Sequence, residues 1–181
     1  MAFTPRVAAP VESVLDSIER IFRSGYSTHL TNATNWTTGT CPAGHWILQE
    51  GTKFHRTDDP EFEVRPALVI GEVTGVRPVY ENSRELWDVP VFIEVRYSRG
   101  YQPADSQSLM EQLAGVFTHG IITAGGSFIP SKTMLSTAVS GSTPGLNVIY
   151  VHEVESAPYE EPNALVLHLQ FTVRCSGMAA T

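Results

Sequence analysis

The sequence predicts an α+β fold: an antiparallel sheet of about four or more strands, two helices packed on one face, and long loop or hairpin arms. Three observations predict it. Two segments repeat apolar residues with the period of a helix. Several other segments alternate, or are uniformly apolar, as strands are. The strand segments near the C-terminus are joined by a short turn, which favours antiparallel pairing and leaves one face for the helices.

Composition and charge limit the classes of protein that fit. The 181 residues, of which 42% are hydrophobic and 17% charged, suit one domain with its own core. The net charge of −7 argues against a surface that grips nucleic acid. We expect no membrane span, because no apolar run is long enough, and no secretory signal. Synthesis in the cytoplasm would keep the two cysteines, Cys41 and Cys175, reduced.

The first helix is predicted over Pro10–Gly25. Its apolar residues recur at intervals of four, three and four: Val11, Leu15, Ile18 and Phe22. Pro10 suits the first turn, and Gly25 suits the position just after the helix. The acidic side chains lie early and the arginines late, as the helix dipole favours.

Two long segments rich in small and polar residues interrupt the regular elements. They are residues 26–63 and 123–144, and we expect extended loops or hairpin insertions there. Within the first, His45–Gly51 is compatible with a short strand. Connections of this length in a compact domain are usually functional.

The first strands lie in the middle of the chain. Ala67–Val73 is almost wholly apolar. Val89–Tyr97 alternates, so its valines and isoleucine face one way while Glu94 and Arg96 face the other. Phe92 interrupts the polar face, and we therefore expect that face to be partly covered.

The second helix and the last two strands follow. The helix is predicted at about Ser106–Thr118, with Asp105 as its N-cap. Strands are predicted at Leu146–Ser156 and Ala164–Cys175, with the turn at Ala157–Asn163 between them. The last strand alternates over its whole length and is the strongest strand signal in the chain.

Residues that could carry chemistry do not form a convincing set. Cys41 and His45 have C-x3-H spacing, with His55 further on, but a zinc site needs a fourth ligand. The glycine pair in Thr123–Phe128 lacks the spacing of a phosphate-binding loop. Glu160–Glu161 is expected in a solvated turn. We predict no catalytic, cofactor-binding or metal-binding residue, and a protein that is not an enzyme.

Aromatic residues in the two long segments are candidates for partner contacts, because aromatic side chains anchor protein interfaces. They are Trp36, Trp46, Phe54, Phe62 and Phe128. The alternative is that these side chains fold back on the core of their own domain.

The order of these elements resembles the tail terminator (tail completion, minor tail) proteins of long-tailed bacteriophages. The resemblance rests on the helix VESVLDSIERIF, on PALVIGEVTG and on the strand, loop and helix of WDVPVFIEVRYSRGYQPADSQSLMEQLAGVF. It ends with the strand LVLHLQFTVRC. The two long segments are larger than in typical members of the family.

The resemblance implies a structural protein of the virion. Members form a ring, commonly a homo-hexamer, on the last ring of tail-tube protein. They stop tube polymerisation and offer a joining surface to the head-tail connector or stopper protein in the neck. DNA would pass through the lumen without specific binding, which the acidic net charge suits. The loop that carries Arg96, Arg99 and Tyr101 would then touch a neighbouring subunit.

Two alternatives stay open. The first is another neck or tail component of similar architecture, such as a head-tail stopper or a tail-tube-like protein. The second is a small α+β enzyme or ligand-binding domain, which would need a convergent polar site.

Overall fold

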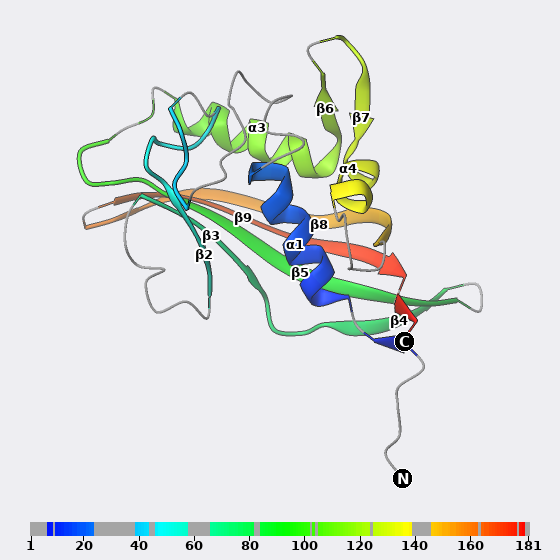
Figure 1. Ribbon diagram of the computed structural model, residues 1–181. Helices are drawn as coiled ribbons and strands as arrows, with labels where there is room; N and C mark the ends of the chain where they lie inside the picture. The colour runs from blue at the N-terminus through cyan, green and yellow to red at the C-terminus, as the bar shows by residue number, and fades with distance from the viewer. Residues whose placement is uncertain are drawn as a thin grey trace.

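A computed structural model describes residues 7–8, 10–23, 39–43, 46–57, 66–81, 84–101, 103, 105–123, 125–138, 146–162, 164–176 and 178–179. These residues form a sheet with helices packed on one face (Figure 1). The predicted α+β class is confirmed.

The main sheet of the described chain has six strands. Five lie side by side in the order β2 (Lys53–Arg56), β3 (Ala67–Glu72), β5 (Arg84–Arg96), β9 (Ala164–Ser176) and β8 (Asn147–Glu161), and β4 (Arg77–Glu81) pairs with the start of β5. The sheet differs from the predicted antiparallel one at an edge, because β2 runs parallel to β3. Residues 57–66 join the two strands along the chain.

The alternation of β5 works as predicted. The valines and isoleucine of the apolar face are buried, and they lie opposite large apolar residues of β9: Val91 opposite Phe171, Ile93 opposite Leu169 and Val95 opposite Leu167. Glu94 and Arg96 lie on the other face. Phe92 on that face stacks on His168 of β9, with 5.9 Å between ring centroids, so the expected partial cover is confirmed.

Three helices lie on the apolar face within the described residues: α1 (Val11–Arg23), α3 (Ser106–Thr118) and α4 (Ser131–Ala138) (Figure 1). The first two match the predictions. The carbonyl of Pro10 accepts the amide of Val14 at 3.0 Å, so Pro10 stands just before the first turn of α1. Asp105 caps α3 as predicted, because its carboxylate accepts the amide of Ser108 at 2.9 Å. Gly25 lies outside the described residues.

A run of aromatic rings joins the helices to the sheet. Phe117 of α3 lies 6.2 Å from Phe22 of α1 and 5.0 Å from Phe171 of β9, measured between ring centroids. All three side chains are buried. Phe117 therefore stands at the centre of the core, where two helices meet the sheet.

The second long segment is more regular than predicted. The hairpin β6 (Gly120–Ile122) and β7 (Phe128–Pro130) leads directly into α4. The sequence of α4 is rich in Ser and Thr, which are weak helix formers, so its helix was not predicted. Met134 and Leu135 of α4 are fully buried, and this tertiary packing overrides the low propensity. Residues 139–144 lie outside the described part.

The described part of the first long segment packs against the domain. Ile47 and Leu48 are buried, and the hydroxyl of Tyr97 donates to the carbonyl of Ile47 at 2.7 Å. Residues 46–51 form bends and turns, so the strand expected within His45–Gly51 is wrong, and β2 begins at Lys53.

The last hairpin is longer than predicted. β8 continues through the expected turn to Glu161, so the segment Ala157–Glu161 is strand and pairs with β9. At the other end, β1 (Val7–Ala8) pairs with β10 (Met178–Ala179), which brings the two ends of the described chain together. In the residues that the structure describes, no helix has both the length and the apolar character needed to cross a membrane.

Candidate functional site

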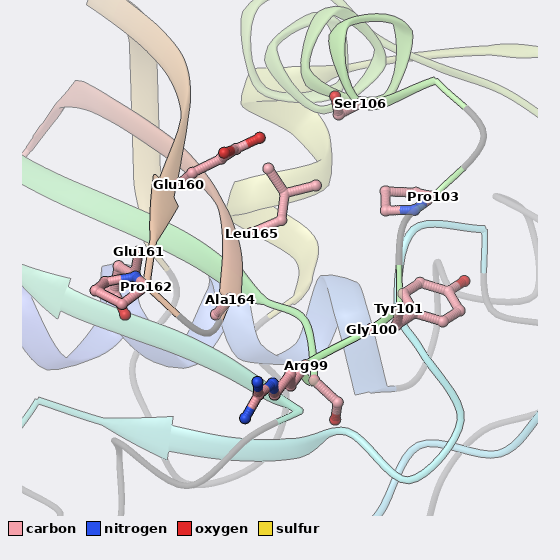
Figure 2. A pocket seen from close by; sticks show the side chains of 11 residues that line it. Arg99, Gly100, Tyr101, Pro103, Ser106, Glu160, Glu161, Pro162, Ala164 and Leu165 are labelled. Atoms are coloured by element: carbon pink, nitrogen blue, oxygen red, sulfur yellow. The ribbon is translucent and has the colours of Figure 1, made fainter.

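A pocket of about 330 Å³ opens between the β5–α3 loop and the end of the β8–β9 hairpin. We call it the loop pocket. Its lining comes from two separate parts of the chain: Ser98, Arg99, Gly100, Tyr101, Pro103 and Ser106 on one side, and Glu160, Glu161, Pro162, Ala164 and Leu165 on the other. Figure 2 shows Leu165 between the hairpin and the loop that carries Tyr101 and Pro103.

Backbone hydrogen bonds shape the loop pocket. The amide of Tyr97 donates to the carbonyl of Leu165 at 3.0 Å, which joins the β5–α3 loop to β9. Within the loop, the amide of Tyr101 donates to the carbonyl of Ser98 at 3.1 Å. Gly100 takes φ +81° in this turn, a value that favours glycine. The ring of Tyr101 packs 5.2 Å from that of Tyr97. The loop is thus fixed on the end of the sheet.

The lining of the loop pocket combines several kinds of side chain. Two prolines, Tyr101 and Leu165 give it apolar surface, while Arg99 and the glutamates carry charge. Two serines add hydroxyl groups, and among the described residues that line the pocket there is no histidine, cysteine or lysine.

The β6–β7 hairpin holds large apolar side chains in solvent. Ile122 is 69% exposed and Phe128 is 58% exposed, and the two lie opposite each other across the hairpin. The hairpin extends away from the helices at the upper right of Figure 1. We call this element, with Ile122 and Phe128, the hairpin knob.

The tip of the hairpin knob has a defined turn. The amide of Thr123 donates to the carbonyl of Ser127 at 2.9 Å, and Gly126 donates to the carbonyl of Thr123 at 2.9 Å. The hydroxyl of Thr123 accepts the amide of Ser127 at 3.1 Å. An exposed apolar pair on an ordered hairpin is typical of an interface element, since little conformational freedom is then lost on binding.

Gly120→Ala is expected to break the base of the hairpin knob. A Cβ there would lie 2.0 Å from the carbonyl oxygen of Ile129, and φ is +134°. We expect the free energy of unfolding to fall by about 1–3 kcal/mol and amide exchange to rise over residues 120–130. Urea unfolding and hydrogen exchange measure these effects. Gly115→Ala in α3 is the matched control, because nothing lies within 4 Å and a helix tolerates alanine well. Equal stability of the two variants would contradict the prediction.

The sheet face away from the helices carries buried charged groups beside buried valines, Val69 and Val166, and we call it the polar face. Asp88 is 1% exposed there, and Arg174 holds it with two hydrogen bonds, from Nε to Oδ1 at 2.7 Å and from Nη2 to Oδ2 at 2.8 Å. His152 lies 3.4 Å from Oδ1. The hydrogen bonds from Arg174 hold the pKa of Asp88 below its ordinary value.

A second carboxylate on the polar face is paired in the same way. Arg96 donates to Oε2 of Glu94 from Nε at 2.9 Å and from Nη2 at 2.6 Å. His168 and Tyr159 approach Oε1 at 3.0 and 3.2 Å. Burial alone would raise the pKa of Glu94, but the hydrogen bonds from His168 and Arg96 outweigh it and lower the pKa to about 2. Both buried carboxylates therefore stay charged at neutral pH.

The structure separates the predicted interface residues into distinct places. Arg99 and Tyr101 line the loop pocket, and Phe128 stands on the hairpin knob. Arg96 lies on the polar face, where it is buried against Glu94. Arg96 is the last residue of β5 and points away from the helices, because side chains alternate between the two faces of a strand. Arg99 and Tyr101 belong to the loop that begins directly after it.

The aromatic residues of the first long segment behave differently. Trp46 and Phe54 pack against the core and are only partly exposed. The guanidinium groups of Arg23 and Arg56 lie 5.0 and 5.8 Å from the ring centroid of Phe54. For these two residues the structure favours the alternative of folding back on the domain. Trp36 and Phe62 lie outside the described residues.

Sequence reasoning missed two members of these surfaces. Ile122 was overlooked, although its position before the glycine pair, with Phe128 after it, is a hairpin signal. Glu160 was assigned to a solvated turn, but it belongs to β8 and lines the loop pocket. That role depends on the β5–α3 loop, which is distant in sequence.

Metal binding by the C-x3-H pattern receives no support from the described residues. Burial raises the pKa of Cys41 to about 12, so its thiol stays protonated at neutral pH and is a weak metal ligand. His45 lies outside the described residues. Within the described ranges, no group of three or more His, Cys, Asp or Glu residues is placed to hold a metal ion.

Comparison of the sequence with protein-family models and with curated proteins gives no match.

Proposed function

We propose that this protein is a structural subunit of a bacteriophage tail, which forms a ring at the head-proximal end of the tail tube. It stops tube polymerisation and provides the surface for head-tail joining. The observation that carries the proposal is the ordered hairpin knob, which keeps Ile122 and Phe128 in solvent. A single copy gains nothing from this exposure, and apolar side chains held out on an ordered element suit contact with another protein.

The polar face does not depend on a second protein to pair its charged groups. Its buried carboxylates are already paired with arginines of the same chain, so it needs no partner to satisfy them. With the net charge of −7, such a face would let DNA pass through a lumen without specific binding. The proposed ring would enclose this lumen.

Strand addition at the β8 edge is disfavoured as the mode of subunit contact. Pro158 removes a backbone donor, and the register shifts between His152 and Glu155. Four glutamates also lie along this strand: Glu153, Glu155, Glu160 and Glu161. Charge, proline and bulges are the devices that keep edge strands from pairing. We therefore expect subunits to meet through side chains of the hairpin knob rather than by extending the sheet.

Electron microscopy of purified protein, alone and with tail tubes, tests the proposal. We expect discrete rings, or caps on one end of each tube, and an arrest of tube growth. Tails assembled without the protein should be overlong and should fail to join heads. Long tubes formed by the protein alone would favour a tail-tube-like protein. A protein that neither forms rings nor binds tube ends would overturn the proposal.

The loop pocket supports a second candidate, a small ligand-binding domain. Its volume of about 330 Å³ lies at the lower end of the range of about 300–1,000 Å³ that small-ligand sites occupy. A ligand that fills it would raise the melting temperature. A screen of common metabolites by thermal shift distinguishes this candidate from the ring protein. A metabolite counts as a ligand of the loop pocket only if it raises the melting temperature of wild type but not that of Arg99→Ala.

A further inference from the structure

We infer that the hairpin knob of one copy of this protein docks into the loop pocket of a second copy, so that the copies associate head to tail. The inference rests on the proposed ring and names the two surfaces that would close it. The proposed function already expects subunits to meet through the hairpin knob, and the inference adds the surface that receives it.

The two surfaces lie at opposite ends of α3. Ser106, the first residue of α3, lines the loop pocket, whereas the hairpin knob begins at Gly120, just past the helix end. A helix of 13 residues separates them by about 20 Å. Figure 1 shows the same arrangement, with the β5–α3 loop at the left and the β6–β7 hairpin at the right. The knob of a chain therefore cannot reach its own pocket.

Such a placement sets the symmetry of the contact. When a surface at one end of one copy fits a different surface at the other end of the next copy, the interface is heterologous. Repeated heterologous contacts close into a ring when the rotation between neighbouring copies allows it. A two-fold contact between two hairpin knobs would instead stop at a dimer. The docking of knob into pocket is a heterologous contact, the kind from which a ring is built.

The knob and the loop pocket share a limited apolar contact surface. The knob presents a pair of apolar side chains, Ile122 and Phe128, on a tip without charged residues. Most of the lining of the loop pocket is polar, and its smaller apolar part comes from two prolines, Tyr101 and Leu165. Phe128 is the natural anchor, because large aromatic side chains that enter a preformed recess contribute most of the binding energy of an interface.

The charges around the two surfaces have opposite sign. Lys132 is the charged residue of β6, β7 and α4, and it is exposed close to the base of the knob. The pocket lining holds one arginine, Arg99, and two glutamates, Glu160 and Glu161, and so carries a net negative charge. Lys132 of one copy would approach the glutamates of the next as the knob enters. Such a rim pair orients two copies more than it strengthens their contact.

Thiol crosslinking between two variants that each carry one added cysteine tests the inference directly. Ser127→Cys places a thiol on the knob tip, and Ser106→Cys places one in the loop pocket. Cys41 and Cys175 are buried and should react slowly, and wild type measures that background. A short bismaleimide added to the mixture should give a crosslinked dimer of one variant with the other. Each variant alone should give little dimer, because knob does not meet knob and pocket does not meet pocket.

A matched control uses Ser156→Cys on the exposed part of β8 in place of Ser106→Cys. It should crosslink to Ser127→Cys no more than wild type does. Equal crosslinking of the two mixtures, or no crosslinking up to the solubility limit, would overturn the inference. Dimers from Ser127→Cys alone would also overturn it, because they indicate a two-fold contact between knobs.

Substitutions in the hairpin knob and the loop pocket test the proposed docking independently. Phe128→Ser should weaken association about tenfold or more, measured by mass photometry over a concentration series. Lys132→Glu should weaken it several-fold, and Glu160→Lys combined with Lys132→Glu should recover most of the loss. Loss of association in Lys132→Glu without recovery in the double variant would count against the proposed pairing of these residues.

The outcomes separate this inference from the proposed function. Rings or tube caps that form without crosslinking of knob to pocket would leave the proposed function intact and remove the inference. Crosslinking of knob to pocket in a protein that does not bind tail tubes would keep the inference and remove the tail function.

Discussion

Replacement of Phe117 by alanine is expected to lower the free energy of unfolding by about 3–5 kcal/mol. The side chain is fully buried, and its ring lies between Phe22 of α1 and Phe171 of β9. Its removal leaves a cavity at the point where two helices meet the sheet, and the surrounding elements are tied down by the β5–β9 ladder. Urea unfolding followed by circular dichroism measures the change.

Phe128→Ala is the matched control for this effect. Phe128 is 58% exposed, so its truncation should change the free energy of unfolding of the monomer by no more than about 0.5 kcal/mol. The same substitution should weaken the association between copies. Phe117 is therefore expected to stabilise a single copy, and Phe128 to stabilise the contact between copies. A similar loss of monomer stability in both variants would contradict the assignment of Phe128 to a binding surface.

Glu94→Gln is expected to destabilise the protein by about 2–3 kcal/mol at pH 7, and by progressively less as the pH falls. Burial alone would raise the pKa of Glu94, but hydrogen bonds from His168 and Arg96 lower it from 4.5 to about 2 in the folded state. The unfolded chain therefore takes up a proton at Glu94 before the folded chain does. The stabilisation from the carboxylate is present above about pH 4.5 and is lost as the pH falls towards 2.

Urea unfolding of wild type and Glu94→Gln between pH 7 and pH 2.5 measures this dependence. The difference in free energy between the two proteins should shrink across the acid half of that range. Glu155→Gln on the polar face is the control, because Glu155 is exposed and its replacement should have a small effect at every pH. A difference between wild type and Glu94→Gln that does not change with pH would show that the ion pair with Arg96 is not the source of the stabilisation.

These predictions separate the parts of the molecule that hold the fold from the parts that we propose for assembly. Phe117 and Glu94 lie on the two faces of the sheet and stabilise a single copy. The exposed side chains of the hairpin knob, Ile122 and Phe128, contribute little to that stability. Substitutions of these two side chains should therefore change assembly while the fold stays intact. Arg96 does not belong to this class, since its loss would leave Glu94 buried without its strongest partner.

Much of the fold could be predicted because local patterns agree with the tertiary structure. The 3.6-residue repeat located α1 and α3, and the carboxylate of Asp105 marked the start of α3. Alternation assigned the two faces of β5 and β9 correctly, because a strand that is buried on one face must place every second side chain in the core.

Other elements could not be predicted, and each has a physical reason. The helix α4 has weak intrinsic propensity and depends on the burial of Met134 and Leu135 against the rest of the domain. The parallel pairing of β2 with β3 follows no local signal, since sequence patterns do not encode strand direction. The extension of β8 to Glu161 is stabilised by pairing with β9 and not by its own exposed, acidic sequence.

The sequence by itself determined the α+β class, the two main helices, the faces of the central strands and the absence of a recognisable catalytic motif. These are local properties, written in the spacing of apolar and polar residues. Only the tertiary structure decided where the two surfaces proposed for assembly lie. It brought the β5–α3 loop to the end of the β8–β9 hairpin to form a pocket, and it placed Ile122 and Phe128 at the far end of α3. Contacts between distant segments arise when the chain buries its core, so no stretch of sequence carries them alone.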